Sequence, residues 1–404
     1  MGCAVLWAPF YGVADVSVRV RQALGSDIAA DGYSTPYVAA VAYGSAFYGF
    51  AAILLSIAAA RRMIGPGALS SGLAVWAGTP LLFYMYVAPP FSHACSAFAV
   101  AVFVTIWLQV RQTWALRGMI ALGLAGALMA MVREQDIFFT LGPALDFSLA
   151  LLMGKRTRAA AKFLTHALAG CAAFAIGYLP QLLAYSALNG STHRILGMAY
   201  PGPASDVQRK MSWHAPHALQ VLFSPEHGFL FWTPLAVVSI AGLVLLAVRS
   251  SVRLTGAAEA VAVRRSFARS RTPDAGRIGG CMLLMVATQV YISGAVESWT
   301  VAGAFGQRRF VAVTIFLVVG LAAARAAARG RWARPAMSAV IILAIYWNIA
   351  LMAEFGTLMM DRQRLEPRRN AYDAFVTLPR VGPRLVYRYL MQRESFYRPP
   401  ATGR

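Results

Sequence analysis

Arginine side chains in two short polar segments supply the residue type that best binds an anionic oxygen group. The segment MVREQD, residues 131–136, contains Arg133 and Gln135, and the segment GAFGQRRF, residues 303–310, contains Arg308 and Arg309. A guanidinium group donates paired hydrogen bonds to phosphate or carboxylate oxygens, and glycine lets a backbone approach a ligand closely. We therefore predict that these four side chains bind a phosphate group.

Carboxylates and histidines that could act as acids or bases lie in three further segments. Asp27 and Asp31 belong to SDIAADGYSTPY, His93 belongs to VAPPFSHACSAF, and Glu226 and His227 belong to SPEHGFLFWTP. Because Glu226 and His227 are adjacent, they could form an acid/base or metal-binding pair. Asp27, Asp31 and Glu226 are weak candidates for a catalytic carboxylate, and His93 and His227 are candidates for a polar site.

Structural roles compete with each of these assignments. Ser34 or Thr35 could cap a helix that starts at Pro36, and His93 could cap the helix that follows it. Aromatic residues like those behind His227 are typical of the belt at a membrane surface. The pattern leaves both kinds of role open.

The sequence shows no ligand spacing typical of a metal site. The cysteines are scattered and lie mostly inside apolar segments, at Cys3, Cys95, Cys171 and Cys281. Zinc and redox centres need paired spacing, so we predict neither a cysteine metal site nor a disulfide framework, and we assign no cofactor. Asp146 lies inside an apolar segment, where an unpaired charge costs about 2.5 to 3.5 kcal/mol. We expect it either to be paired within a helical bundle or to form part of a proton path.

Long apolar segments must position these polar groups. Hydrophobic residues make up 58% of the 404 residues, and the mean hydropathy is +0.57, which is more than a soluble core requires. Apolar stretches of about 18 residues recur, and each could cross a hydrocarbon layer as a helix. We predict an all-α, polytopic transmembrane bundle of about ten spans, at 36–60, 69–88, 94–110, 115–132, 137–154, 163–188, 228–248, 279–296, 310–328 and 337–360.

The formal charge of +21 indicates topology rather than a nucleic-acid partner. Basic residues cluster in every second connection between the apolar segments, as the positive-inside bias requires on the cytoplasmic side. The clusters are Arg61 and Arg62, Arg111 and Arg117, 155–162, 249–277 and 325–334. The other connections, which hold most of the candidate site residues, are then external.

This topology divides the chain into five parts. Residues 1–35 are predicted as an external amphipathic segment and not a span, because the start has no basic residue, contains Pro9 and ends its apolar run at Asp15. The remaining parts are a larger transmembrane bundle at 36–248 with an external loop at 189–227, a basic cytoplasmic loop at 249–278, C-terminal transmembrane helices at 279–360 and a basic tail at 361–404.

The order of the segments resembles bacterial GT-C-type membrane glycosyltransferases, the broad family of the dolichyl-phosphate-mannose protein mannosyltransferases and the lipid A aminoarabinose transferase. The resemblance covers most of the chain and rests on WAPFYGV, DGYSTPY, PPFSHACSAF, VREQ, SPEHGFLFWTP and GAFGQRRF. It implies a GT-C-like bundle in the bacterial cytoplasmic (inner) membrane with its active face on the external, periplasmic side.

The resemblance also implies a reaction. A sugar would move, with inversion, from a polyprenyl-phosphate donor to an acceptor, while Arg133, Arg308 and Arg309 hold the lipid phosphate. The family places its key acidic residue just after the first transmembrane helix, and this chain begins beyond the matching point. We therefore expect it to lack that helix and the catalytic acid. A divalent metal occurs in the family, but no ligand set for one is visible in the sequence.

Two other functions compete with sugar transfer. A transporter or lipid flippase would have ionisable residues along a cavity at the membrane midplane and a repeat of its two halves. Only Asp146 favours it, and the sequence shows no convincing repeat. An inactive membrane scaffold descended from the enzyme would explain an absent acid.

Overall fold

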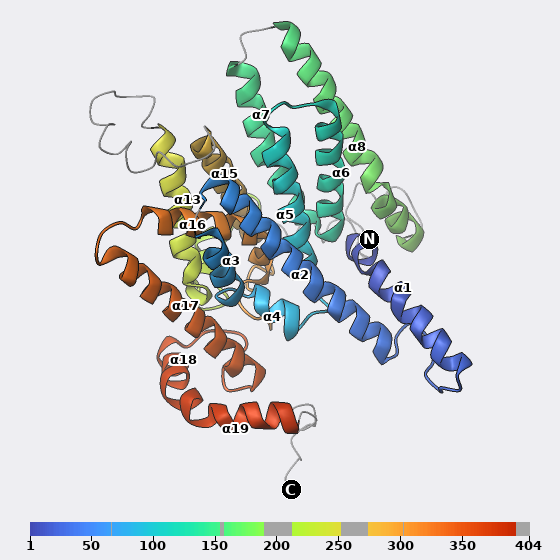
Figure 1. Cartoon of the computed structure of the whole chain (residues 1–404), viewed down its shortest axis with the longest axis vertical. Helices are drawn as coiled ribbons and strands as arrows, with labels where there is room; N and C mark the ends of the chain where they lie inside the picture. The colour runs from blue at the N-terminus through green and yellow to red at the C-terminus, as the bar shows by residue number, and fades with distance from the viewer. Residues whose placement is uncertain (66, 154–156, 190–211, 252–273, 302, 393–404) are drawn as a thin grey trace.

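Helices form the whole secondary structure of the part that the structure describes (Figure 1). This computed structural model describes all residues except 66, 154–156, 190–211, 252–273, 302 and 393–404. Each of the ten apolar segments predicted as spans is mainly helical in its described residues, and these residues contain no strand, so the all-α prediction is confirmed. Seven helices are long and apolar enough to cross a membrane, as in a multi-pass membrane protein.

Six of the predicted spans correspond to these long helices. They are α2 (Thr35–Met63), α5 (His93–Val110), α8 (Thr157–Asn189), α15 (Ala275–Ala295), the 3-10 turn η3 (Arg308–Val313) with α16 (Thr314–Ala327), and α17 (Ala333–Gly356). The start of α2, with Pro36 in its first turn, lies within one residue of the predicted helix start.

The other four predicted spans are shorter or interrupted, so the structure does not support a count of ten long helices. They are α3 (Ala68–Ala77) with α4 (Leu81–Tyr86), α6 (Leu116–Val132), η1 (Glu134–Thr140) with α7 (Leu141–Met153), and α12 (Phe229–Trp232) with α13 (Leu235–Ser251). Two of the breaks fall at Pro80 and Pro234, since proline has no N–H to continue a helix. A prediction from the length of an apolar segment does not detect such breaks.

The seventh long helix is α1 (Gly2–Ala23), and it corrects the prediction for residues 1–35. Its length and composition suit a span, whereas the sequence suggested too short an apolar run. Neither Pro9 nor Asp15 ends the helix. The Asp15 carboxylate is satisfied, because it accepts a hydrogen bond of 2.7 Å from the Tyr37 hydroxyl of α2 and pairs with Arg19.

Helices α5, α15 and α16 are the most buried of the long helices and form the centre of the bundle. Helix α5 packs against α2, α6 and η3, and α16 packs against α13 and α2. Small residues allow the closest crossing: a Cβ atom added at Gly242 of α13 would overlap the carbonyl oxygen of Gly320 of α16. Close backbone approach at small residues is typical of packed transmembrane helices.

The tail folds back onto α17. It contains α18 (Pro367–Tyr372), a π-helical turn η4 (Asp373–Thr377) and α19 (Leu378–Met391), and in Figure 1 these lie beside and below the end of α17. Most of the predicted basic loop at 249–278 and much of the predicted external loop at 189–227 lie outside the described residues, although α11 (Ala218–Phe223) of the latter is described.

Two ends of the bundle are named here by residues of α5. The His93 end is where α5 begins, close to the end of α6 and to η3; the Arg111 end is where α5 finishes, close to the start of α15. The candidate residues Arg133 and Arg308 lie at the His93 end. Arg111 lies at the opposite end, and so do the ends of α2 and α16 that carry Arg62 and Arg325.

Candidate functional site

Arg133 and His93 come together at the His93 end. Arg133 follows the last residue of α6 and is half-buried, while His93 is the buried first residue of α5. A guanidinium nitrogen of Arg133 lies 2.7 Å from Nδ1 of His93, and another donates to Oε1 of Gln135 at 3.3 Å. Because a guanidinium only donates, Nδ1 of His93 must accept this bond. The predicted residues Arg133, Gln135 and His93 are therefore one contiguous group.

The segment that carries Arg308 reaches the same group through Tyr84. The hydroxyl of Tyr84, on α4, donates to the carbonyl of Phe305 and accepts from its N–H, both at 3.2 Å. The Tyr84 ring also contacts the ring of His93 edge-on, at 4.5 Å between centroids. One buried tyrosine thus fixes the loop before η3 against the start of α5.

Arg308 and Arg133 act on each other electrostatically. Burial lowers the pKa of Arg133, and the positive charge of Arg308 lowers it further, while Asp136 opposes the shift. The half-buried Arg308 side chain makes no hydrogen bond or ion pair with any residue in the described ranges. Two like charges in a half-buried position repel each other, so an anion bound between them would lower the free energy of the cluster.

Arg309, by contrast, is anchored within the protein. Its buried guanidinium donates to the carbonyl of Ser293 at 3.3 Å and to the hydroxyl of Ser298 at 3.0 Å. Its backbone carbonyl accepts from the Gln289 amide at 3.0 Å. The structure thus separates the two adjacent arginines: Arg308 is available to a ligand, and Arg309 holds the segment in place and adds positive charge nearby.

Asp136 joins the cluster, although the sequence did not single it out as a candidate. Its side chain is fully buried and accepts a hydrogen bond of 2.6 Å from the Ser96 hydroxyl, while its other oxygen has no partner among the described residues. Burial raises the pKa of Asp136 to about 6, and Arg133 and Ser96 partly oppose this rise. Its place in MVREQD was visible in the sequence, but its contact with a serine 40 residues away was not.

His227 and Glu226 do not form the acid/base pair considered from the sequence. His227 is fully buried, and its Nε2 donates to the carbonyl of Ala304 at 2.8 Å, whereas Glu226 is exposed. The imidazole stacks on Trp232 at 4.9 Å, and burial lowers its pKa. His227 therefore holds the loop before Arg308 at Ala304, next to Phe305, which Tyr84 contacts.

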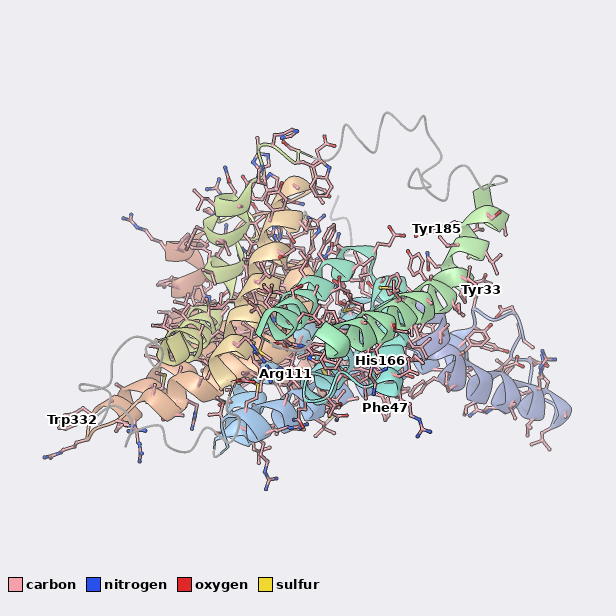
Figure 2. The ribbon with its side chains drawn as sticks, turned by 90° about the horizontal axis from the view of Figure 1, so that it is seen from above. Tyr33, Phe47, Arg111, His166, Tyr185 and Trp332 are labelled. Atoms are coloured by element: carbon pink, nitrogen blue, oxygen red, sulfur yellow. The ribbon has the colours of Figure 1, made fainter. Side chains whose placement is uncertain are left out.

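Asp27 and Asp31 lie away from this cluster. Helix α1 starts beside the backbone of Val132 and runs for 22 residues, roughly 33 Å at 1.5 Å per residue, before the loop that holds both carboxylates. Asp31 accepts hydrogen bonds of 2.8 Å from the backbone N–H groups of Tyr33 and Ser34, which lower its pKa. Tyr33, labelled in Figure 2, belongs to the same loop between α1 and α2. Ser34 occupies the N-cap position of α2, but its hydroxyl donates to the carbonyl of Ala29 at 3.0 Å and makes no capping hydrogen bond, so the predicted side-chain cap is not formed.

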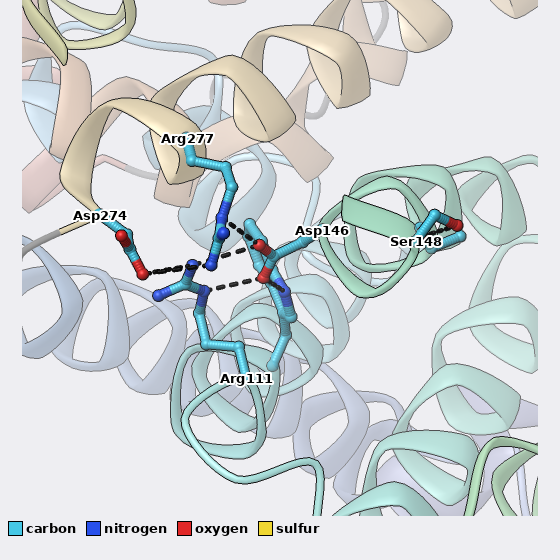
Figure 3. A network of polar contacts seen from close by, with 7 residues as sticks. Arg111, Asp146, Ser148, Asp274 and Arg277 are labelled. Atoms are coloured by element: carbon cyan, nitrogen blue, oxygen red, sulfur yellow. Dashed lines mark hydrogen bonds and ion pairs between the residues drawn. The ribbon is translucent and has the colours of Figure 1, made fainter. Parts of the chain in front are cut away.

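Asp146 belongs to a separate network at the Arg111 end (Figure 3). Its fully buried carboxylate lies 2.8 Å from Arg111 and 2.8 Å from Arg277, and accepts a hydrogen bond of 3.0 Å from the Trp107 indole. Both arginines also contact Asp274. The Asp146 carboxylate therefore links α5, α7 and α15. Of the two roles considered for Asp146, this is the paired role inside the bundle and not a part of an open proton path.

Within the ranges that the structure describes, no three histidine, cysteine or acidic side chains lie close enough together to hold a metal ion, and the four cysteines are free. The site consists instead of guanidinium groups, two histidines and one buried carboxylate. No protein-family model, curated protein or solved structure matches the chain.

Proposed function

We propose that the protein is a membrane glycosyltransferase that moves a sugar from a polyprenyl-phosphate donor to an acceptor. The observation that carries the proposal is that the half-buried Arg133 and Arg308 belong to one cluster: Arg133 contacts His93, and Tyr84 joins His93 to the loop just before Arg308. Such a pair suits a group with several anionic oxygens. In a chain with helices long enough to span a membrane, a lipid-linked phosphate is the ligand class that reaches this position from the bilayer.

The roles within the proposed reaction follow from charge. The acceptor oxygen would form a bond to the anomeric carbon of the sugar while the bond from that carbon to the phosphate oxygen breaks, leaving a polyprenyl phosphate. Arg133 and Arg308 would stabilise the negative charge that develops on this departing phosphate. The acceptor proton needs a base, and Asp136 is the carboxylate placed beside Arg133, with a pKa of about 6 that suits a base near neutral pH.

The proposal includes an orientation. The His93 end would face the outside of the bacterial cytoplasmic membrane, because Arg62, Arg111 and Arg325, which belong to three of the basic clusters, lie at the Arg111 end, and the positive-inside bias places such clusters in the cytoplasm. The sugar, the acceptor and a GT-C-like fold are part of this proposal only through the resemblance of the sequence segments.

Binding of the phosphate is tested first. The purified chain in neutral-lipid nanodiscs would be titrated with radiolabelled polyprenyl phosphate, with the uncharged polyprenol as comparison. Replacing Arg133 or Arg308 by glutamine should weaken binding about tenfold or more, since a hydrogen bond to a charged group contributes about 1.5 to 3 kcal/mol. Arg62→Gln, an exposed arginine at the other end of the bundle, is the matched control and should bind as the unchanged chain does.

Transfer is tested with a donor that carries a labelled sugar, in sealed proteoliposomes. Label that moves from the lipid to a water-soluble or peptide acceptor supports the proposal, provided Arg133→Gln and Arg308→Gln lose it. Donor that crosses the bilayer with its sugar still attached would support the transporter or flippase alternative instead. That alternative loses its one sequence argument, because Asp146 is ion-paired. Equal binding by both arginine variants and the control would refute the site itself.

A further inference from the structure

The helix α19 combines three different faces along 14 residues. Arg380, Arg384 and Arg388 repeat every four residues and therefore share one side, and the helix contains no acidic residue. Leu378, Val381 and Leu385 form a second side that packs toward α17. The third side is apolar and exposed.

The exposed apolar side faces away from the arginines. Val386 and Leu390 are 59% and 67% exposed, and at 100° per residue they project about 160° and about 120° from Arg384, the middle of the line of arginines. Tyr387 lies between the apolar side and the arginines, Tyr389 lies at the other edge of the apolar side, and both are exposed. In water, such an apolar side would cost free energy in proportion to its area. Separated apolar and basic faces are typical of helices that lie in a membrane surface, and tyrosine is enriched there.

The position of α19 matches the level of a membrane surface. The tail packs onto α17 at Tyr346, whose ring lies 5.2 Å from that of Phe375, and at Ala350, which contacts Ala374 and Leu378. Tyr346 precedes the end of α17 by ten residues, roughly 15 Å of helix. Since α17 is one of the seven helices suited to cross a membrane, α19 begins alongside a span and not beyond it.

The direction of α19 agrees with this position. In Figure 1 it runs across the view below the bundle, whereas α5 and α6 run close to the vertical. Near the tail contact, α17 exposes Ile342, Leu343 and Ile349. This apolar surface is typical of contact with lipid. The exposed apolar side of α19 would continue this surface into the same leaflet.

We propose that α19 is an interfacial helix that binds anionic phospholipid of the bilayer in which the chain is embedded. The arginines would lie on headgroup phosphates, and Val386 and Leu390 would enter the outer part of the acyl chains. The inference is independent of the proposed sugar transfer, because no residue of α19 belongs to the cluster at the His93 end.

Hydrogen exchange of the full chain in nanodiscs tests the proposal. We expect the amides of residues 378–391 to exchange more slowly, by about tenfold or more, in discs of phosphatidylcholine with phosphatidylglycerol than in phosphatidylcholine alone, since an anionic surface attracts all three arginines. The difference should disappear in 0.5 M salt, which shortens the screening length to about 4 Å. Equal exchange in the two kinds of disc would overturn the proposal.

Variants separate the lipid from other causes. Replacing Arg380, Arg384 and Arg388 together by glutamine should remove the lipid-dependent difference, while replacing Arg61, Arg62 and Arg334, exposed arginines of the other end, should leave it intact. Unchanged exchange in α5 and α16 shows that both triple variants are folded. Slower exchange on adding inorganic phosphate to neutral discs would assign the arginines to a soluble anion and refute the lipid assignment. Leu390→Asp should speed exchange of α19 in both kinds of disc.

Discussion

At the scale of single residues, Asp136 gives the site a dependence on pH. Its pKa is raised to about 6, compared with about 3.9 for an unperturbed aspartate, so the folded protein holds this proton more tightly than the unfolded chain. Its contribution to stability is therefore fully present below pH 4 and is lost as the pH rises through 6. With about 1.36 kcal/mol for each pKa unit, the loss is about 3 kcal/mol.

The measurement compares the unchanged chain with Asp136→Asn. The free energy of unfolding of the unchanged chain, relative to that of the asparagine variant, should fall by about 3 kcal/mol between pH 4 and pH 7. Asp27→Asn, at an exposed carboxylate, should track the unchanged chain throughout. A relative stability that does not change with pH would show that Asp136 stays ionised, in conflict with its burial.

Asp146 should matter for stability and not for function. Asp146→Ala would remove the buried counterion of Arg111, which is 4% exposed, and of the partly buried Arg277, and would leave them only Asp274, which is 48% exposed. Removing one partner of a buried ion pair costs about 3 to 5 kcal/mol. Asp15→Asn removes the charge of a carboxylate that is 30% exposed and paired with the exposed Arg19, and it should change unfolding in mixed micelles very little. Comparable effects of the two substitutions would contradict the role given to the network.

The sequence could indicate which residues belong to the candidate site, but not which of them meet. Arg133, His93 and Arg308 were recognisable because charged or polar groups next to apolar segments are expensive. The contact of Tyr84 with Phe305, 221 residues away, depends on helix packing, which local patterns do not encode. For the same reason, Arg308 and Arg309 look equivalent in the sequence although only Arg309 is anchored by serines.

At the scale of elements, the crossing of α13 and α16 depends on two glycines. Gly242→Leu would place a side chain where the Gly320 backbone lies and should cost about 1 to 3 kcal/mol or more, as overpacking does. Gly280→Leu in α15 meets open space and is the matched control. If both variants unfold at the same denaturant concentration, then the close approach of the two backbones does not stabilise the packing of α13 against α16.

The lengths of the apolar segments predicted where the helices lie but not where they end. The segment 69–88 contains enough apolar residues for one span, yet Pro80 divides it and frees α4 to turn Tyr84 toward the loop before η3. The tail shows the opposite case. Its helices α18 and α19 contain so many arginines that a search for apolar segments does not find them, and they form because the tail packs on α17.

At the scale of the whole molecule, the proposed orientation predicts which residues a membrane-impermeant thiol reagent can reach. In intact cells, Arg368→Cys, exposed in α18, should react, whereas Arg62→Cys, exposed at the end of α2, should react only after the membrane is permeabilised. The unchanged chain measures the background from its own cysteines. Reaction at Arg62→Cys in intact cells would reverse the orientation and place the His93 end inside.

The long separation between Tyr84 and Phe305 also sets an order of events during synthesis. Tyr84 is synthesised with the first helices, but Phe305, in the loop that Tyr84 contacts, is added to the chain 221 residues later. At about 5 to 20 residues per second, Tyr84 and Phe305 are therefore synthesised roughly 10 to 45 seconds apart. Until then the first helices must remain inserted with an unfinished polar surface, which makes them a natural substrate for a membrane chaperone.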